Sequence, residues 1–544
     1  MANRMCRRDL LNLLSAGGAA LMTSHAAASE NLVAGKPKGG KQQSLAHGLC
    51  LNEDDDHFFG SRHDPDRKQV DAWVDQYAHT QIRELMLCPN SMRTSYASKV
   101  WTPLWKGFDP KAGPDQPLFS SLPPSERQRP WHTVYNAWKL DHDGIDLYKC
   151  WISRARKQGI SPWLSMRMND VHYAYDVDNY IHSDFWRQNP QFRRVNYRFD
   201  QWPDRAFDYG HPEVRKYHMA LIRELAERYD FDGLELDWMR FGFHFRPGHE
   251  AEGVGLLNEF TAEVRNLLDG WQKRRGHRIR LGARVPSRPQ TAVGLGMDAV
   301  AWAQRGLVDM LVITPFWASI EPDMPVELWK QLLRGTHVTL AAGLELLVRP
   351  NGDVPPIMNS LETVRGAAAT LLDRGADRIY LFNYMDSETA TPDLENYSTL
   401  LREVGSPDTV AGKERRHIVT FADTWAPGEP PARTLPAKCG PKRWNAFRVP
   451  TGPKPMTGRA AARLGIQGAA EAEVKTWEVR VNGKLCTFAG TVKPKFSRPD
   501  DPMFEFLAPP GVMNRGYNLI ELAAKSTAQV VWVEMAIDFP TARS

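Results

Sequence analysis

The sequence predicts an α/β protein: a (β/α)8 barrel of the TIM type, followed by an all-β jelly-roll or sandwich domain. Between residues 45 and 405, eight apolar strand-like stretches alternate with helical patterns, which is typical of such a barrel. From residue 415 to 544 helical periodicity is absent, and short strand-like runs are separated by Gly, Pro and Asn turns. A doubly wound sheet is the alternative for the first part. It needs a Gly-rich phosphate turn after an early strand, which the sequence lacks.

The predicted barrel strands are AHGLCLN, IRELMLC, SPWLSMRM, FDGLELDW, IRLGARV, VDMLVIT, VTLAAGLELLV and DRIYLFNYM. Between them, stretches such as HPEVRKYHMALIRELAERY and LETVRGAAATLLDRG repeat apolar residues at helical spacing. Two aromatic-rich insertions, residues 91–140 and 173–208, follow the second and third strands. Loops after barrel strands surround the carboxyl end of the barrel, where substrates bind, so we expect both insertions there.

The N-terminal stretch CRRDLLNLLSAGGAALMTSHAAAS has paired Arg7 and Arg8, a weakly apolar region and then a run of alanines. This pattern predicts that residues 1–28 are a cleavable signal peptide of the twin-arginine type, and that the protein is periplasmic or secreted. A Sec signal or a lipoprotein signal is the alternative, although no Cys follows the apolar region to carry a lipid. That region is too short to predict a membrane span. Residues 29–44 are polar and rich in Gly and Lys, which predicts a disordered leader.

The composition excludes some classes of function. The net charge is only +5 for 544 residues and no basic run is interleaved with aromatics, so we expect no nucleic-acid binding. Of the 6 Cys, one lies in the signal peptide and the others are widely spaced. This is neither a disulfide framework nor a zinc pattern, and we expect no metal and no organic cofactor. The 18 Trp suit stacking on sugar rings, with core packing as the alternative.

The fourth predicted strand carries two carboxylates. The stretch YDFDGLELDWMRF places Glu235 and Asp237 in an otherwise apolar run. Side chains alternate along a strand, so both point into the barrel, with Asp237 nearer its carboxyl end. Buried carboxylates are costly unless they are paired or used. We therefore predict Asp237 as a catalytic residue assisted by Glu235. The alternative is a structural ion pair with one of three arginines: Arg167, Arg240 or Arg284.

A second isolated acid, Glu345, breaks the apolar run AAGLELLV of the seventh strand and faces inward by the same alternation. Two carboxyl groups across a barrel suit glycoside cleavage, because one protonates the leaving oxygen and the other attacks the anomeric carbon or activates water. A structural ion pair is again the alternative. The other strand ends supply the predicted substrate-binding residues: Arg167, Asn169, Asp170, His172, Arg240, Arg284, Trp317, Asn383 and Tyr384. The run NEDDDHFF after the first strand suits a cation or sugar hydroxyls, although exposed charge runs are more common.

Two segments resemble known families. DYGHPEVRKYHMALIRELAERYDFDGLELDW is similar to glycoside-hydrolase-like barrels of the family ten-like type, in which an HPEVR helix leads into the fourth strand. The position of Asp237 matches the acid of that motif, while Glu235, Trp238 and Arg240 depart from it. VRVNGK and NRGYNLIELAA resemble galactose-binding-like jelly-roll domains appended to glycosidases. The resemblance implies a barrel that acts on glycans, with a C-terminal domain that either binds sugar or braces the barrel.

We therefore expect an exported glycoside hydrolase that cleaves a poly- or oligosaccharide with a carboxylate pair, and whose partner is a carbohydrate. One alternative is a non-catalytic glycan-binding barrel. The other is a polysaccharide lyase that holds the carboxylate of a uronic acid with an arginine.

Overall fold

The computed structural model describes residues 47–391, 397–431, 433–493 and 502–539. The predicted signal peptide and leader lie outside the described residues. No helix within the described ranges is long and apolar enough to cross a membrane.

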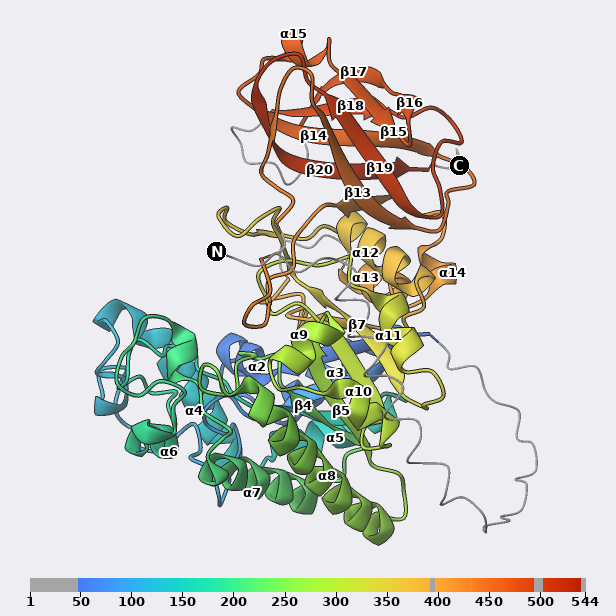
Figure 1. The fold of residues 1–544 in the computed structure, drawn as a ribbon. Coiled ribbons are helices and arrows are strands. Elements are labelled where there is room, and N and C mark those ends of the chain that lie inside the picture. Colours follow the sequence, from blue (N-terminus) through green and yellow to red (C-terminus); the bar gives the residue numbers. More distant parts are fainter. Residues whose placement is uncertain (1–46, 392–396, 432, 494–501, 540–544) are drawn as a thin grey trace, which may run out of the picture. The chain divides into compact units, whose positions relative to one another are not determined.

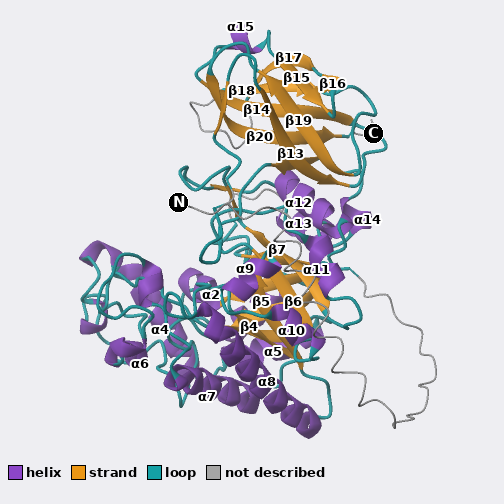
Figure 2. Cartoon of the chain, viewed as in Figure 1, coloured by secondary structure: helices purple, strands orange, loops and turns teal. Residues whose placement is uncertain are grey.

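A closed barrel of parallel strands spans Leu49 to Phe382 (Figure 2), in the order β1-β10-β7-β6-β5-β4-β3-β2. This confirms the predicted barrel. Its strands are β1 (Leu49–Asp54), β2 (Ile82–Cys88), β3 (Ser161–Arg167), β4 (Gly233–Asp237), β5 (Arg280–Pro286), β6 (Met310–Thr314), β7 (Thr339–Glu345) and β10 (Arg378–Phe382). A short hairpin, β8 (Leu347–Val348) with β9 (Ile357–Met358), follows β7.

Strand register places three charged residues side by side at the carboxyl end of the barrel. Asp237 on β4 pairs with Arg167 on β3 on one side and with Arg284 on β5 on the other. Deeper in the barrel, the interior is filled by Trp163 and other apolar side chains. A Cβ at Gly233 would lie 2.3 Å from the Trp163 ring, so glycine is required for this close approach.

Helices surround the barrel. They are α2 (Asp55–Ser61), α3 (Arg67–Asp75), α4 (Gln128–His142), α5 (Leu147–Lys157), α6 (Asp184–Gln188), α7 (Pro212–Arg228), α8 (Glu250–Arg275), α9 (Pro289–Gly294), α10 (Ala299–Gln304), α11 (Val326–Leu332), α12 (Leu361–Asp373), α13 (Tyr397–Glu403) and α14 (Pro407–Val410). The HPEVR segment starts α7 with a proline in its first turn, where the missing N–H costs nothing. Leu234 and Leu236 of β4 lie in the apolar core beneath these helices.

The two insertions after β2 and β3 pack against each other (Figure 1). They contain α4, α6 and the 3-10 turns η1 (Pro117–Phe119), η2 (Pro124–Glu126), η3 (Pro190–Phe192) and η4 (Trp202–Arg205). Arg93 joins them, because its buried guanidinium donates to the carbonyls of His182 at 3.0 Å and Leu104 at 3.2 Å. Lys106 and Asp184 add an ion pair at 2.6 Å. These contacts hold the two insertions to each other.

The C-terminal part is a β-sandwich, as predicted. One sheet has the order β11-β20-β14-β18-β17 with β12 also on β20, and the other has the order β13-β19-β15-β16. The elements are β11 (Arg415–Ile418), β12 (Ala437–Cys439), β13 (Trp444–Gly452), β14 (Arg459–Gln467), α15 (Glu471–Val474), β15 (Glu478–Val481), β16 (Lys484–Leu485), β17 (Thr487–Val492), β18 (Met503–Leu507), β19 (Gly516–Ala523) and β20 (Ala528–Asp538). Apolar side chains from both sheets form a second core.

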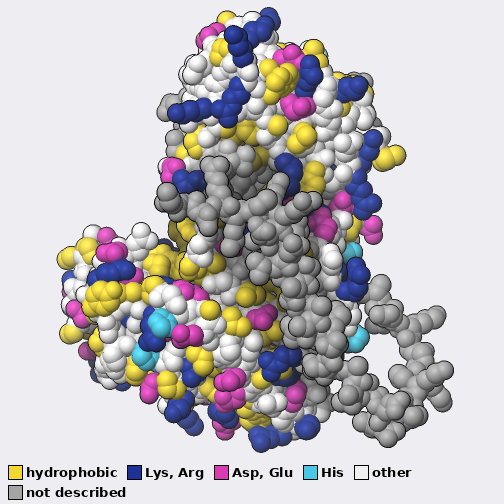
Figure 3. Space-filling model, viewed as in Figure 1, with side chains coloured by type: hydrophobic (Ala, Val, Ile, Leu, Met, Phe, Trp, Pro, Cys, Tyr) yellow, Lys and Arg dark blue, Asp and Glu magenta, His cyan; other side chains and the backbone are white. Residues whose placement is uncertain are grey.

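Helix α12 contacts both β11 and β13. At Gly366 a Cβ would lie 2.0 Å from the Arg416 carbonyl oxygen, so the backbones of α12 and β11 approach closely. Basic and acidic side chains are interspersed on the face of the described residues that Figure 3 presents.

Candidate active site

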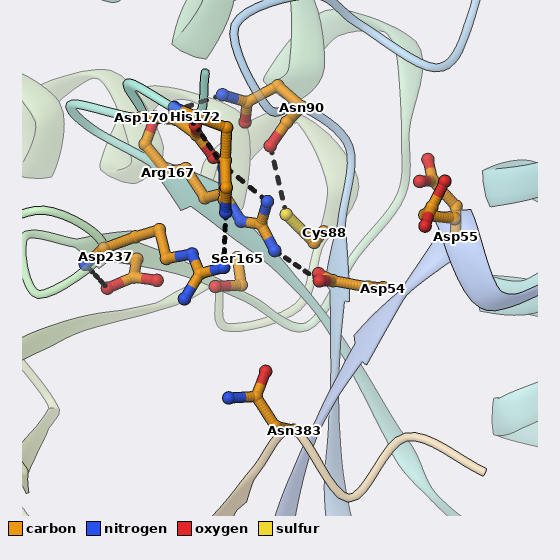
Figure 4. Close-up of polar contacts among 12 residues, drawn as sticks. Asp54, Asp55, Cys88, Asn90, Ser165, Arg167, Asp170, His172, Asp237 and Asn383 are labelled. Atoms are coloured by element: carbon orange, nitrogen blue, oxygen red, sulfur yellow. Dashed lines mark hydrogen bonds and ion pairs between the residues drawn. The ribbon is translucent and has the colours of Figure 1, made fainter. Parts of the chain in front are cut away.

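A cavity of about 270 Å3 opens at the carboxyl end of the barrel. Charged and polar side chains from four strand ends line this cavity, among them Asp54, Asp55, Arg167, His172, Arg240 and Asn383. They follow or end β1, β3, β4 and β10, and Figure 4 shows most of them in one close-up. This is the position at which barrels of this type bind their substrates.

Three bulky or polar residues beside this cavity have left-handed backbone conformations. Tyr173, Phe241 and Asn383 have φ angles of 54°, 66° and 65°, and they follow β3, β4 and β10 respectively. Such conformations cost about 1–3 kcal/mol each and concentrate at binding and catalytic sites. Tyr173 and Asn383 line the cavity themselves. The backbone strain therefore marks the carboxyl end of the barrel as the functional region.

Arg167 is held by two carboxylates. Its Nη1 lies 3.0 Å from Asp170 Oδ2, and its Nη2 donates to Asp54. Burial alone would raise the pKa of Asp170, but His172, Arg167 and Arg240 outweigh it and hold that pKa well below its ordinary value. Burial opposes ionisation of Asp54 too, yet Arg167 and Arg240 lower its pKa. Both acids are therefore carboxylates, and the charge of Arg167 is fully used.

His172 joins Asp170 to Arg240. Its Nδ1 lies 2.7 Å from Asp170 Oδ1, and its Nε2 lies 2.9 Å from Arg240 Nη2. An arginine only donates hydrogen bonds, so Nε2 accepts and the proton resides on Nδ1. His172 thus orients Arg240. Among the described residues Arg240 has no carboxylate within ion-pair distance, and its buried Nε has no hydrogen-bond partner.

Asp237 forms an enclosed ion pair. Its Oδ2 lies 3.0 Å from Arg284 Nη1, and the side chains are 1% and 0% exposed. Its Oδ1 accepts the backbone N–H groups of Met239 at 3.0 Å and Arg240 at 2.9 Å. Every bond that Asp237 makes is one that a carboxylate accepts. The structural alternative of the sequence analysis, an arginine partner, is therefore present, and the same contacts hold the carboxylate in a fixed orientation.

Glu235 lies one layer deeper in the barrel, as strand alternation predicts. Its Oε1 accepts from Ser165 at 2.8 Å and Tyr380 at 2.9 Å, whereas Oε2 is buried without a partner among the described residues. Burial, and then the neighbouring Asp237, raise the pKa of Glu235 to about 7. Glu235 is therefore close to half protonated at neutral pH.

Glu345 ends β7 and is also enclosed, at 2% exposure. Its Oε1 accepts from Asn383 Nδ2 at 2.7 Å and from the Leu346 N–H at 3.0 Å, while its Oε2 accepts no hydrogen bond from any described residue. Burial raises the pKa of Glu345 to about 8, despite the opposing effects of Asn383 and Arg240. The carboxyl group is thus mainly protonated at neutral pH, and the two donors on Oε1 direct the proton to Oε2.

Neither Asp237 nor Glu345 lines the cavity. Each is linked to it by one residue that does: Arg240 follows Asp237 and donates its backbone N–H to it, and Asn383 donates to Glu345. Arg284 lowers the pKa of both Glu235 and Glu345, against the larger effect of burial. The three predicted catalytic acids therefore surround the same arginine.

Some predicted binding residues have other partners. The Asn169 amide donates to the Phe207 and Phe243 carbonyls at 3.0 and 2.9 Å, and so ties the loops after β3 and β4 together. Tyr384 is fully buried and its hydroxyl donates to the Glu345 carbonyl at 3.2 Å. Trp317, after β6, is 42% exposed, and the Arg349 guanidinium lies 5.8 Å from its ring. Of these three, only Trp317 offers an exposed surface to a ligand.

Asp55 is not among the site residues predicted from the sequence; it lies in the run NEDDDHFF. In the structure Asp55 lines the cavity and is partly exposed, and its Oδ2 contacts the Tyr148 hydroxyl from α5. Burial, with the adjacent Asp54 and Asp56, raises the pKa of Asp55 to about 7. In the sequence, the position of Asp55 directly after a barrel strand indicates a role at the site. The sequence does not indicate its partner Tyr148, which lies far away along the chain.

Comparison with known proteins gives similarity in structure only. No protein-family model matches the chain and no curated protein matches it. A cycloisomaltooligosaccharide glucanotransferase from Paenibacillus sp. is 10% identical over 91% of this chain and 58% of its own, with a TM-score of 0.32. Alpha-L-fucosidase isoenzyme 2 from Paenibacillus thiaminolyticus is 12% identical over 66% of this chain and 48% of its own, with a TM-score of 0.40.

A family GH18 chitinase from Chromobacterium violaceum is 10% identical over 93% of this chain and 90% of its own, with a TM-score of 0.34. This chain spans 58% and 48% of the lengths of the glucanotransferase and the fucosidase. These three proteins are named as glycan-active enzymes, and similarity at this level establishes neither the substrate nor the mechanism of this chain.

Proposed function

We propose that the chain is a glycoside hydrolase in which Glu345 is the general acid and Asp237 is the nucleophile or general base. One observation carries the proposal: the two carboxyl groups are held in opposite protonation states. Burial raises the pKa of Glu345 to about 8 and no described residue donates to its Oε2, whereas Asp237 makes an ion pair with Arg284. A pair of acids separated in this way is the arrangement that glycoside cleavage requires.

In the proposed reaction Glu345 first gives up a proton and later regains one. Glu345 Oε2–H donates its proton to the glycosidic oxygen, and the bond from that oxygen to the anomeric carbon breaks. If Asp237 attacks this carbon, a glycosyl ester forms; a water then attacks the same carbon, the bond to Asp237 breaks, and the Glu345 carboxylate takes the proton of that water. If Asp237 is instead the base, it takes the proton of the attacking water in a single step, and proton exchange with solvent returns both groups to their starting states. The reacting sugar is placed between Asn383 and Arg240, the two cavity residues that contact Glu345 and Asp237.

Glu235 has a supporting role in this proposal. It lies beneath Asp237 on β4, and its pKa of about 7 reflects burial and that neighbouring carboxylate. When protonated, Glu235 spares the barrel interior a second negative charge beside Asp237. Glu235→Gln preserves the neutral form and is expected to lower turnover less than Asp237→Asn.

The proposal also covers the compartment in which the protein acts and the carbohydrate that it binds. We propose export to the periplasm or beyond through the paired Arg7 and Arg8, and a poly- or oligosaccharide substrate. The exposed aromatic rings of Tyr173 and Trp317, at 46% and 42%, are suited to stacking on sugar residues next to the cleaved bond.

The test is incubation of the purified protein with a panel of polysaccharides and aryl glycosides. Release of reducing ends supports the hydrolase, and proton NMR of the first product gives its anomeric configuration. Retention of a glycan without any cleavage would indicate a binding protein, and unsaturated products absorbing in the ultraviolet would indicate a lyase. Either of those results would overturn the proposal. Loss of release in both Asp237→Asn and Glu345→Gln assigns the activity to this site.

A further inference from the structure

Asp55 is a cavity acid that the proposed reaction does not use. It follows β1 directly, lines the cavity and is partly exposed. Asp54 points toward the Arg167 guanidinium, whereas Asp55 lies apart from it at the start of α2 (Figure 4). Within the described part of the chain, Asp55 has no ion-pair partner. It therefore lacks the cation that keeps Asp54 and Asp170 ionised.

The hydrogen bonds of Tyr148 indicate the protonation state of Asp55. The Tyr148 hydroxyl lies 2.8 Å from the Cys88 carbonyl oxygen and also contacts Asp55 Oδ2. A hydroxyl has one proton to donate, and a carbonyl only accepts. If Tyr148 donates to Cys88, both contacts are satisfied only when Asp55 itself carries a proton and donates it to the tyrosine oxygen. Burial raises the pKa of Tyr148 far above its ordinary value, so the phenol keeps its own proton.

We propose that Tyr148 holds Asp55 as a neutral carboxylic acid and that the cavity binds its sugar in this form, so that substrate affinity falls when Asp55 ionises. The physical reason is desolvation. A sugar that covers the cavity removes water from Asp55, which a neutral acid tolerates far better than an unpaired carboxylate. The statement about affinity rests on the proposed function; the statement about protonation does not.

The surrounding charges are consistent with this state. Burial, and then the flanking Asp54 and Asp56, raise the pKa of Asp55, hydrogen bonds from Ser95 and Tyr148 oppose them, and the resulting pKa is about 7. Arg167 from β3 is neutralised by Asp54 and Asp170. The other nearby charged groups lie on α2, α4 and the segment after β10: Asp56 is 3.9 Å from Arg129, and His57 is 3.5 Å from Asp386. The neighbouring Cys88 thiol has a pKa that burial raises, so it stays neutral.

The barrel contains a matched control. Glu53, two residues earlier on β1, contacts the Tyr77 hydroxyl, which also contacts the Met385 carbonyl. The hydrogen-bond pattern is the same, and burial raises the pKa of Glu53. Glu53, however, is fully buried and does not line the cavity. Changes at Asp55 and Glu53 therefore separate an effect on the ligand from an effect on a buried acid–tyrosine pair.

The first measurement needs no substrate. Infrared difference spectra between wild type and Asp55→Asn are recorded at about pH 5 and about pH 9, on either side of the expected ionisation. We expect the carbonyl band of one protonated carboxylic acid at the lower pH and its loss at the higher pH. An ionised carboxylate at both values would overturn the proposal. Failure of this test leaves the proposed hydrolase untouched.

The second measurement uses a glycan that the wild type cleaves. KM is expected to rise about tenfold per pH unit above the Asp55 pKa, and kcat is expected to change less. Asp55→Asn mimics the neutral acid, because its amide donates to Tyr148, so its KM should not depend on pH. Glu53→Gln should retain the wild-type dependence. A rise of KM with pH in Asp55→Asn as steep as in the wild type would overturn the proposal.

Discussion

Arg284 Nη1 lies 3.0 Å from Asp237 Oδ2 at the carboxyl end of the barrel, and neither side chain is more than 1% exposed. Arg284 also stacks on Phe382, with its guanidinium carbon 3.7 Å from the ring centroid, and its Nε and Nη2 have no partner among the described residues. The ion pair therefore has two consequences. Each charge keeps the other from being buried without a partner, and the pair fixes the proposed nucleophile.

Asp237→Asn is expected to reduce both activity and stability. Removing one partner leaves the Arg284 charge buried and unpaired, which costs about 3–5 kcal/mol. Loss of the carboxylate should lower kcat by about 1,000-fold or more. Thermal unfolding and kinetics, recorded well below the variant's melting temperature, separate the two effects.

The double variant Asp237→Leu with Arg284→Met is the control for stability. It removes both charges, so it should recover most of the lost unfolding free energy while remaining inactive. Near-native turnover in Asp237→Asn would show that this carboxylate has only the structural role, and Glu235 would then be the next acid to test.

Glu345→Gln should abolish the alkaline limb of the pH profile. In the wild type, kcat/KM is expected to fall as pH rises through about 8, because Glu345 then loses the proton that it donates. The amide has no such proton, so activity should fall about 100- to 10,000-fold on natural glycosides and less on aryl glycosides with good leaving groups.

The matched control for Glu345→Gln is Glu505→Gln in the sandwich. Glu505 is also buried and pairs with Arg463 at 2.8 Å and Arg459 at 3.2 Å. This variant should be less stable but should keep the wild-type pH profile. If Glu345→Gln retains the alkaline limb, the acid is another residue.

The buried acids also predict how stability varies with pH. Folding raises the pKa of Glu345 from its ordinary value of 4.5 to about 8. Between these values the unfolded chain releases the proton and the folded chain keeps it, so the stability of the folded state should fall by about 1.4 kcal/mol per pH unit. Glu345→Gln removes this contribution. Its melting temperature relative to wild type should therefore rise between about pH 5 and pH 8, and a constant difference would contradict the raised pKa.

Much of the fold is visible in the sequence because its causes are local. The alternation of strands and helices predicts the barrel, and the two-residue spacing of Glu235 and Asp237 predicts that both face its interior. The contacts that decide their chemistry join residues far apart in the chain. Tyr380 contacts Glu235, Asn383 contacts Glu345, and Tyr148 contacts Asp55. The sequence pattern predicts which face of a strand a side chain occupies, but the folded structure determines which distant residue it contacts.

Export remains a prediction from the sequence. If the route is the twin-arginine pathway, replacing both Arg7 and Arg8 with lysine should stop export, because that pathway recognises the arginine pair. Cell fractionation followed by immunoblotting measures the periplasmic share. Unchanged export of the double variant would indicate the Sec route.

Two helix glycines provide a test of the contact between the barrel and the sandwich. In α12, a Cβ at Gly366 would lie 2.0 Å from the Arg416 carbonyl oxygen on β11, and backbone atoms cannot move aside as a flexible side chain does. In α8, a Cβ at Gly270 would have no atom within 4 Å. Alanine favours a helix over glycine by about 0.5–1 kcal/mol when nothing obstructs it. Gly270→Ala should therefore stabilise the protein by about that amount.

Gly366→Ala is expected to destabilise by about 1–3 kcal/mol, because overpacking against a fixed backbone outweighs the gain in helix propensity. Chemical denaturation followed by circular dichroism gives both values. The three atoms nearest to a Cβ at Gly366 all belong to Arg416 and none to a catalytic candidate, so the activity of folded Gly366→Ala should equal that of wild type. If Gly366→Ala is as stable as Gly270→Ala, then α12 and β11 do not pack as closely in solution, and the sandwich is held to the barrel by other contacts.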